Sequence, residues 1–352
     1  MEASFAASGD VAPDRRDVLA DGIAREEARL AELIHEQDRA KARLDALKVE
    51  LASHGAEPAV RIHLPPSIPG PVPATSAGKV ALFHSLFRGR DDVYPRLWIS
   101  AKTGKKGYAP ACSNEWVRGV CEKPQVKCGE CPSQAFLPFS DKAVLDHLQG
   151  RHVMGVYPLL RDETCWFLAV DFDKGSWAED VAAFRETCRS VGLPAAVERS
   201  RSGNGTHVWF FFSAPVPAGT ARKMGSYLLT ETMQRRHQLG MGSYDRLFPN
   251  QDTMPRGGFG NLIALPLQHD PREKGNTLFV DEGFVPYPDQ WAYLASVRRI
   301  EPAVVEEVAR AAARLGQVMG VRLWGTGDGE EDAAPWLRLP SRRPRKIPVL
   351  GP

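Results

Sequence analysis

The chain has 352 residues, of which 43% are hydrophobic and 25% charged, and this balance is typical of a globular protein of two or three modules. No apolar stretch approaches the roughly 20 residues that cross a bilayer, and the first residues lack the charged and then apolar pattern of a secretory signal. These features do not indicate a membrane or secreted protein, and we expect a cytoplasmic protein.

The net charge of +2 is small, but its distribution along the chain is uneven. Residues 1–56 carry 8 Lys and Arg against 12 Asp and Glu, which leaves 37 against 31 for residues 57–352. Basic residues cluster in the segments 88–106 and 338–346. A surface that contacts phosphates requires such clusters, although solvated loops often have the same composition.

The first predicted elements are a disordered N-terminus over residues 1–16 and a long helix over residues 17–53. Apolar residues of this helix recur with alternating spacings of four and three, the heptad pattern of a coiled coil. We predict a coiled coil that dimerises the protein or binds a partner; a single amphipathic helix lying on its own domain is the alternative. The seam consists of Leu19, Ile23, Glu26, Leu30, Leu33, Gln37, Ala40, Leu44, Leu47 and Leu51.

Proline and small residues dominate residues 54–78, which cannot sustain a helix or a central strand and are predicted to form an extended linker. A folded domain over residues 79–297 follows and begins with a short helix in "KVALFHSLFRGR". A further helix is expected within residues 298–320, and residues 321–352 are expected to form a basic, irregular tail.

Four cysteines fall within a lobe predicted over residues 108–135, with the spacing C-x8-C-x6-C-x2-C. Four thiolates so close together favour a tetrahedral zinc site, which would order a segment with few apolar residues. An iron–sulfur cluster and free or redox-active thiols are the alternatives. The four residues are Cys112, Cys121, Cys128 and Cys131, whereas Cys165 and Cys188 lie in a predicted strand and helix and are expected in the core.

The apolar segment "CWFLAV" (165–170) is typical of a strand covered on both faces, and it leads directly into Asp171 and Asp173. Residues two apart in a strand point to the same side, so these carboxylates face one way while Phe172 packs into the opposite layer. Their repulsion would raise the pKa of one of them unless a cation neutralised both. We therefore predict an Mg2+ or Mn2+ site, with an ordinary strand cap as the alternative.

A β-hairpin is predicted next, in which "AAVERSRSG" leads into a glycine turn and "THVWFFF" forms the returning strand. His207 begins that strand. A lone histidine at such a place is more often structural, but here arginines, hydroxyl groups and backbone amides surround it, a combination suited to a triphosphate. The predicted nucleotide-binding residues of the hairpin are Arg199, Arg201, Ser202, Asn204, Thr206 and His207.

A third segment supplies candidates for a further metal ligand. Asp245 follows Tyr244 at the predicted start of a strand, and Asp252 lies seven residues later. Asp245 is preferred because the hydrophobic residue before it would fix its direction, whereas an ordinary turn also explains Asp252. The glycine-rich segment "RGGFGN" then leads into the apolar strand "LIALPL", and Arg256 within it is a further candidate for the triphosphate.

Together these segments resemble the archaeo-eukaryotic primase superfamily of primase-polymerases, and they are most similar to the primase domain of TOTE-type conflict systems and of CRISPR-associated primase-polymerases. Members carry an Asp-x-Asp/Glu motif, a Ser-x-His motif and a later hydrophobic-Asp motif. Gly205 stands where the family has its serine, so Ser202 or Thr206 would supply the hydroxyl. The resemblance covers about residues 79–297, and the motif residues are Asp171 with Asp173, His207, and Asp245.

The resemblance implies an α+β fold: a primase catalytic core of two α/β subdomains, one of them like an RNA-recognition-motif sheet, with the active site in the cleft between them. A zinc-binding insertion and an N-terminal coiled-coil helix would complete it. It also implies a DNA primase-polymerase, which makes or extends primers on a template from NTPs or dNTPs by a two-metal mechanism. The aspartates would hold Mg2+ or Mn2+, and His207 would contact the triphosphate.

The implied partners are single-stranded DNA or a primer-template, and a helicase or nuclease, because relatives often continue into a helicase domain. A role in DNA replication would follow. Two other functions use the same residues differently: a non-catalytic zinc-containing nucleic-acid-binding module, in which the aspartates only cap a strand, and a metal-dependent nuclease. A labelled primer-template incubated with triphosphates separates the three hypotheses, because the product would be longer, unchanged or shorter.

Overall fold

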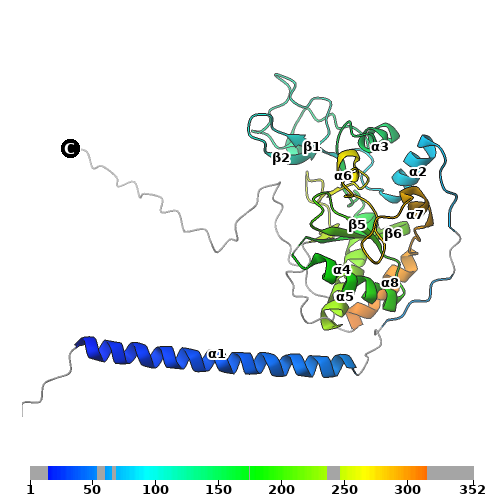
Figure 1. The fold of residues 1–352 in the computed structure, drawn as a ribbon. Coiled ribbons are helices and arrows are strands. Elements are labelled where there is room, and N and C mark those ends of the chain that lie inside the picture. The colour runs from blue at the N-terminus through cyan, green and yellow to red at the C-terminus, as the bar shows by residue number, and fades with distance from the viewer. Residues whose placement is uncertain (1–14, 54–59, 66–68, 174, 236–245, 315–352) are drawn as a thin grey trace, which may run out of the picture.

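The computed structural model describes residues 15–53, 60–65, 69–173, 175–235 and 246–314. At the centre of the folded domain lies a four-stranded antiparallel sheet with the strand order β5-β6-β4-β7 (Figure 1). Its elements follow the chain order β4-α4-β5-β6-α5-β7, the ferredoxin-like arrangement that RNA-recognition-motif sheets share. They are β4 (Thr164–Phe172), α4 (Trp177–Val191), β5 (Ala196–Arg199), β6 (Thr206–Pro217), α5 (Ala218–Arg235) and β7 (Arg246–Phe248).

The apolar sequence of β4 explains its central place in the sheet. Leu168 and Val170 point into one hydrophobic core, and Phe167 and Ala169 point into another on the opposite face. All four side chains are fully buried. A strand without polar residues can be stable only where both of its faces are covered, which confirms the buried strand expected before Asp171.

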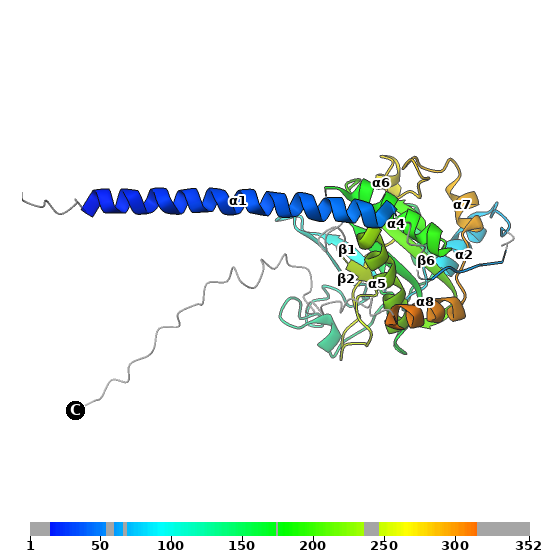
Figure 2. The same cartoon turned by 90° about the horizontal axis from the view of Figure 1, so that it is seen from below.

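Helices α4, α5 and α8 (Pro302–Arg314) cover one face of the sheet (Figures 1 and 2). Their apolar side chains share a core with the sheet, and Cys165 and Cys188 are buried in it, as expected. Val305 and Val308 of α8 are fully buried there. The helix expected within residues 298–320 is therefore part of this core.

A second layer covers the opposite face of the sheet (Figure 1). It rests on an aromatic cluster, in which the ring of Phe87 meets those of Trp209 at 5.0 Å and Phe211 at 5.3 Å, both edge-on. Its elements are α2 (Ser76–Leu86), β1 (Pro95–Ile99), β2 (Lys106–Pro110), the short 3-10 helix η1 (Cys128–Glu130), α3 (Asp141–Leu148), β3 (Gly155–Val156), β8 (Ile263–Ala264), α6 (His269–Arg272) and α7 (Gln290–Ser296).

Part of the segment predicted as a linker packs on the domain. Val60 and Ile62 are buried, and the Ile62 N–H donates to the Val191 carbonyl at 2.7 Å. A side chain on Gly192 would bring its Cβ within 2.1 Å of the Ile62 carbonyl oxygen, so glycine is required there. The packed domain thus begins before residue 79, because alternating apolar residues bury one side of this extended segment.

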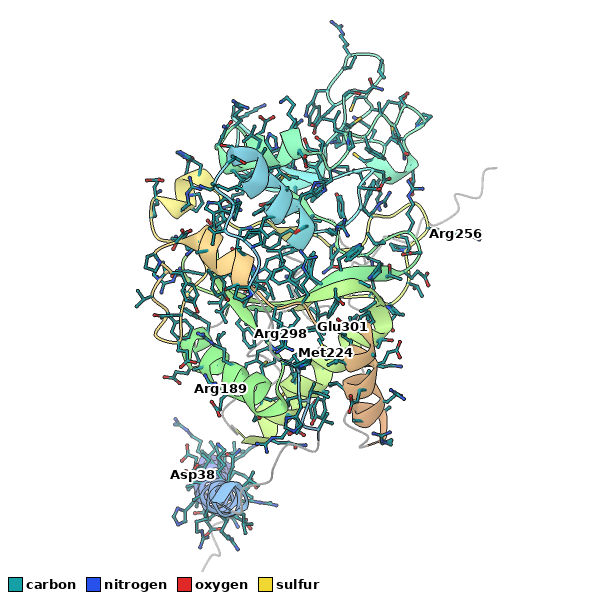
Figure 3. The ribbon with its side chains drawn as sticks, turned by 90° about the vertical axis from the view of Figure 1, so that its right-hand side faces the viewer. Asp38, Arg189, Met224, Arg256, Arg298 and Glu301 are labelled. Carbon is teal, nitrogen blue, oxygen red and sulfur yellow. The ribbon has the colours of Figure 1, made fainter. Side chains whose placement is uncertain are left out.

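Helix α1 (Arg15–Ser53) covers the segment predicted as a helix over residues 17–53 and stands apart from the domain in Figures 1 and 3. Figure 3 looks along its axis, and side chains, Asp38 among them, radiate from it on all sides. Among the described residues, no helix combines the length and the apolar character needed to cross a membrane.

Candidate active site

One row of alternating charges crosses the central sheet where β4 ends. Glu198 on β5 pairs with His207 on β6, His207 pairs with Asp171 on β4, and Asp171 pairs with Arg246 on β7. Directly paired residues of neighbouring strands share a face of the sheet. The row therefore lies on the face that carries Trp209 and the second layer, opposite α4 and α5.

His207 is held between two carboxylates. Its Nδ1 lies 3.0 Å from Glu198 Oε2, and its Nε2 lies 3.6 Å from Asp171 Oδ1. Burial alone would lower the pKa of His207, but the negative charge of Glu198, its hydrogen bond and then Asp171 raise that pKa to about 9. At neutral pH the imidazole is therefore a cation whose Nδ1–H donates to Glu198 and whose Nε2 lies beside Asp171.

Glu198 is the buried end of the row. Its side chain is only 1% exposed, and its Oε2 also accepts a hydrogen bond from Trp209 Nε1 at 3.0 Å. A buried carboxylate is stable only when hydrogen-bonded and paired with a cation, and Trp209 and His207 supply both. Glu198 thus orients the histidine from behind.

The two aspartates differ in their surroundings. Asp171 ends β4 beside His207 with 17% of its side chain exposed, while Asp173 follows the strand and is exposed. Phe172 between them is buried in the core beneath α4 and α5, as expected. The first carboxylate is therefore positioned by the sheet, and the second lies at the solvent edge of the same strand end.

The structure explains why Gly205 replaces the serine of the Ser-x-His motif. A Cβ at this position would lie 2.6 Å from the Phe172 carbonyl oxygen and 3.1 Å from the Asp173 Cα. The turn before His207 therefore packs its backbone directly against the end of β4. Only glycine permits that approach, and it brings the histidine strand and the aspartate strand together.

The other predicted turn residues lie on two different sides. Arg199 has its guanidinium over the Trp177 ring of α4, at 5.7 Å, and Thr206 is buried opposite Phe172. Both therefore point away from the face that carries His207. Thr206 cannot supply the missing hydroxyl on that face.

Arg201, Ser202 and Asn204 remain in the turn itself. Ser202 Oγ accepts the Asn204 N–H at 3.2 Å and lies 3.2 Å from Ser200 Oγ, which shapes the loop. The charge of Arg201 acts on the Tyr108 hydroxyl of β2, opposing the rise in pKa that burial causes there. The turn is therefore ordered and lies near the hairpin of the second layer.

The structure describes only one of the two candidates for the third metal-binding carboxylate. Asp245 lies outside the described residues; β7 begins at the next residue, Arg246, which pairs with Asp171. Asp252, which was the alternative ligand, forms an ion pair with Arg222 of α5. The loop after it returns to the other end of β4, where the Met254 N–H donates to Glu163 at 3.2 Å.

That end of β4 is far from the aspartate pair. Thr164 and Asp171 lie about 23 Å apart along the strand at 3.3 Å per residue. Asp252 was therefore a wrong candidate: it stabilises the start of α5 instead. Arg256 is exposed on the loop that follows, and no contact in the described part of the chain joins it to the row (Figure 3).

Sequence reasoning missed Glu198 and Arg246. The hairpin offered a signal for the first, because a six-residue turn that pairs Arg199 with Thr206 also pairs Glu198 with His207. An acidic residue in an otherwise apolar strand, opposite a histidine, indicates a buried ion pair. Arg246 offered no such signal, because β7 is separated from β4 by two helices and two strands in the chain.

The four cysteines of the lobe surround one small cavity, together with Glu115 and Lys123. The backbone N–H groups of Lys123 and Trp116 donate to Cys121 and lower its pKa, while burial raises the pKa of Cys128 against the opposing effect of Lys123. As they stand, no three His, Cys, Asp or Glu side chains of the described ranges are arranged to hold a metal ion.

The lobe is docked on the glycine-rich loop before β8. A Cβ on Gly129 would lie 1.9 Å from the Gly257 carbonyl oxygen, so the two backbones are in contact. Phe259 of the same loop packs edge-on against Phe136 at 5.3 Å, and the Arg90 guanidinium lies 5.3 Å from its ring. The turn of the lobe and this loop therefore form one packed unit.

Comparisons with known proteins place the chain in a family. The model of the archaeo-eukaryotic primase domain of TOTE conflict systems matches residues 78–308. Among solved structures, the chain is similar to the polymerase domain from Mycobacterium tuberculosis ligase D in complex with DNA, with 16% identity, a TM-score of 0.38, and coverage of 68% of this chain and 87% of that chain. A comparison with curated proteins gave no match. Because the family match spans well over half of the chain and contains both the aspartate pair and the histidine, the chain belongs to the archaeo-eukaryotic primase domains of TOTE conflict systems.

Proposed function

We propose that the chain is a DNA primase-polymerase, which adds nucleotides from nucleoside triphosphates to a template-paired primer end. Primases of this superfamily are nucleotidyltransferases, so the reaction class follows from the family. One observation carries the proposal: Asp171 and His207 face each other at 3.6 Å across the sheet, with Asp173 next along the strand. Carboxylates beside a cationic donor suit a triphosphate that arrives with a divalent metal.

Asp171 and Asp173 are the proposed metal ligands, with Asp245 as the third. Carboxylate oxygens are the ligands that Mg2+ and Mn2+ prefer, and the strand end supplies two of them together. Divalent cations bound there would activate the attacking 3′-hydroxyl and stabilise the pyrophosphate leaving group. Asp245 lies outside the described residues, immediately before β7, and its assignment rests on the resemblance to the hydrophobic-Asp motif of the family.

His207 is the proposed triphosphate contact. It is fixed by Glu198 and carries a proton at neutral pH, so it can donate a charge-assisted hydrogen bond to a phosphate oxygen. The turn beside it adds Arg201, Ser202 and Asn204. We leave Arg199 and Thr206 out of the proposal, because both point to the other face of the sheet.

The test is a labelled primer-template incubated with Mn2+ or Mg2+ and all four triphosphates, as dNTPs and, separately, as NTPs. We expect longer products. Unchanged primer would support a non-catalytic binding module, and shortened primer would support a nuclease. The resemblance also supports a helicase or nuclease partner, and we include that partner and a cytoplasmic location in the proposal.

We assign template binding to the β1–β2 hairpin, which rises above the sheet in Figure 1. Trp98 on β1 pairs with Gly107 on β2, and a Cβ on that glycine would lie 2.9 Å from the Trp98 Cζ2. The indole therefore lies flat on the glycine backbone, and the side chain is still 42% exposed. A flat aromatic ring beside exposed lysines suits single-stranded DNA, which stacks its bases and is held by its phosphates.

Removing the three exposed lysines of the hairpin will weaken the binding of single-stranded DNA and its salt dependence together. In the variant Lys102→Ala/Lys105→Ala/Lys106→Ala, the negative slope of log K against log salt should become shallower by about two, since each phosphate contact contributes about 0.7. Fluorescence anisotropy with a labelled oligonucleotide measures it. Lys223→Ala, an exposed lysine on α5, should leave the slope unchanged. An unchanged slope in the triple variant would place the template elsewhere.

We propose a structural zinc ion for the four lobe cysteines. They surround one cavity, and two backbone N–H groups already donate to the sulfur of Cys121, as they do in zinc knuckles. A lobe with few apolar residues gains its order from such a site. Zinc here would also stabilise the contact between Gly129 and the loop that carries Arg256.

The purified protein is expected to contain about one zinc per chain by mass spectrometry of metals. The variant Cys128→Ser/Cys131→Ser should lose it and become sensitive to proteases within residues 108–135. Cys188→Ala, which changes a cysteine buried in the core, should keep the metal. Wild-type protein that carries no zinc after refolding in the presence of zinc would contradict the assignment. Bound iron in place of zinc would indicate an iron–sulfur cluster at the four cysteines.

A further inference from the structure

The apolar seam of α1 is uncovered in the structure. Leu19, Ile23, Leu30, Leu33, Leu44 and Leu47 are each between 50% and 62% exposed. Leucines repeated along one stripe of a 39-residue helix stabilise it only when a second surface covers them. The domain does not cover them, since α1 stands apart from it in Figures 1 and 3.

The heptad positions follow from the spacing. Ile23, Leu30, Gln37 and Leu44 occupy the a positions, and Leu19, Glu26, Leu33, Ala40 and Leu47 occupy the d positions. The flanking g positions are charged and alternate in sign: Arg29, Glu36 and Arg43. These charges, with the two polar seam residues, decide which partner orientation is stable.

A parallel pairing in register is unfavourable. It places each d residue against its own copy, so Glu26 would meet the Glu26 of a second chain inside the seam. Two like charges in a partly buried layer repel, and no basic residue of the neighbouring seam positions neutralises them. The same arrangement also stacks Gln37 against its own copy.

An antiparallel pairing has one register that avoids these conflicts. When Leu30 meets Leu47 of the second copy, Leu33 meets Leu44, and Gln37 lies against the small Ala40 at the centre. Glu36 then faces Arg43 of the second copy, and by the two-fold symmetry this pair occurs twice in the dimer. Glu26 moves to the end of the overlap, away from its own copy.

The neighbouring antiparallel registers are worse. A shift by one heptad in one direction brings Glu36 against its own copy, and a shift in the other brings Arg43 against its own copy. A shift by two heptads toward the N-terminus places Glu26 against Gln37 inside the seam and Leu47 against Arg16. Charge complementarity therefore selects a single register.

We propose that α1 binds a second copy of this chain as an antiparallel coiled coil in the register that pairs Leu30 with Leu47. The overlap then runs from about residue 24 to residue 53. The C-terminal ends of the two helices lie about 44 Å apart along the axis, at 1.5 Å per residue. The two catalytic domains are thus held at opposite ends of a rod, and each keeps its own active site.

A charge swap on the full chain tests the register. Glu36→Arg alone and Arg43→Glu alone should each raise the dimer dissociation constant by about tenfold, because two attractive pairs become repulsive. The double variant Glu36→Arg/Arg43→Glu should restore wild-type affinity. A parallel dimer would place Glu36 against Lys41 and Arg43 against Lys48, so in that dimer Arg43→Glu alone would lower the dissociation constant instead of raising it. Glu32→Arg, the same charge change on the outer face, is the matched control.

Cysteine cross-linking tests the same register independently of charge. Leu30→Cys and Leu47→Cys, each purified alone and mildly oxidised, should give no cross-linked dimer, since a residue and its own copy lie about 25 Å apart. Mixing the two variants should give a disulfide-linked heterodimer, with wild type as the control for native cysteines. Self-cross-linking of either variant, a mixture without cross-links, or a monomeric wild type by light scattering would overturn the proposal.

Discussion

Replacing both Asp171 and Asp173 with asparagine is expected to abolish nucleotide incorporation, with a loss of about a thousandfold or more. Asparagine keeps the shape of each side chain but removes the two charges that a divalent cation needs. Asp171 lies beside His207, which keeps its pair with Glu198, so the substitution removes only one of the two carboxylates next to the imidazole. Primer extension with labelled triphosphates measures the loss.

The fold is expected to survive this double substitution. Asp171 and Asp173 lie at the solvent end of β4, whereas the residues that build the core, such as Phe172, are unchanged. Circular dichroism and single-stranded DNA binding should therefore remain close to wild type. Asp270→Asn, at a carboxylate that is 87% exposed on α6, is the matched control and should extend primers normally. Wild-type extension by the double variant would end the assignment of these carboxylates.

Glu198→Gln is expected to lower kcat/KM for the triphosphate by about 10- to 100-fold, the usual effect of losing a partner that orients a functional histidine. The amide keeps the size of the carboxyl group and a hydrogen bond to Trp209, but it removes the charge that raises the pKa of His207. The imidazole would then be less positively charged and less firmly oriented. Most of the loss should appear in KM for the triphosphate.

Trp209→Phe is the matched control for Glu198→Gln. It removes the other hydrogen bond to Glu198 and leaves the pair with His207 intact. A purely structural role for Glu198 would make the two variants equally harmful to the melting temperature and to KM. If Glu198 acts through His207, KM rises only in Glu198→Gln. Equal KM values for wild type and Glu198→Gln would contradict the positioning role.

The sequence predicted the parts of the site that depend on local patterns. The uninterrupted apolar run before Asp171 required a doubly covered strand, and the glycine turn before His207 required a hairpin. The alternation of side chains along a strand correctly predicted that Phe172 packs into the layer opposite the aspartates. These inferences hold because period and turn chemistry are properties of a few neighbouring residues.

Contacts between distant strands were beyond such reasoning. The pairing of Asp171 with Arg246 depends on how β7 returns to the sheet after α5, which no local pattern encodes. For the same reason Asp252 was a plausible ligand in the sequence, although its loop returns to the far end of β4. The packing of Ile62 on α4 was also missed, because proline-rich composition predicts only an extended chain, which can still bury alternate side chains.

The end of β4 and the start of the neighbouring strand β6 are proposed to bind the metal and the triphosphate together. A crystal of the full chain grown with Mn2+ and a non-hydrolysable nucleoside triphosphate tests it most directly, through the anomalous signal of manganese. We expect a manganese peak between the carboxylates of Asp171 and Asp173, with phosphate oxygens within hydrogen-bonding distance of His207 Nε2. A nucleotide bound with its metal at any other place, and these three side chains without contact to it, would contradict the account.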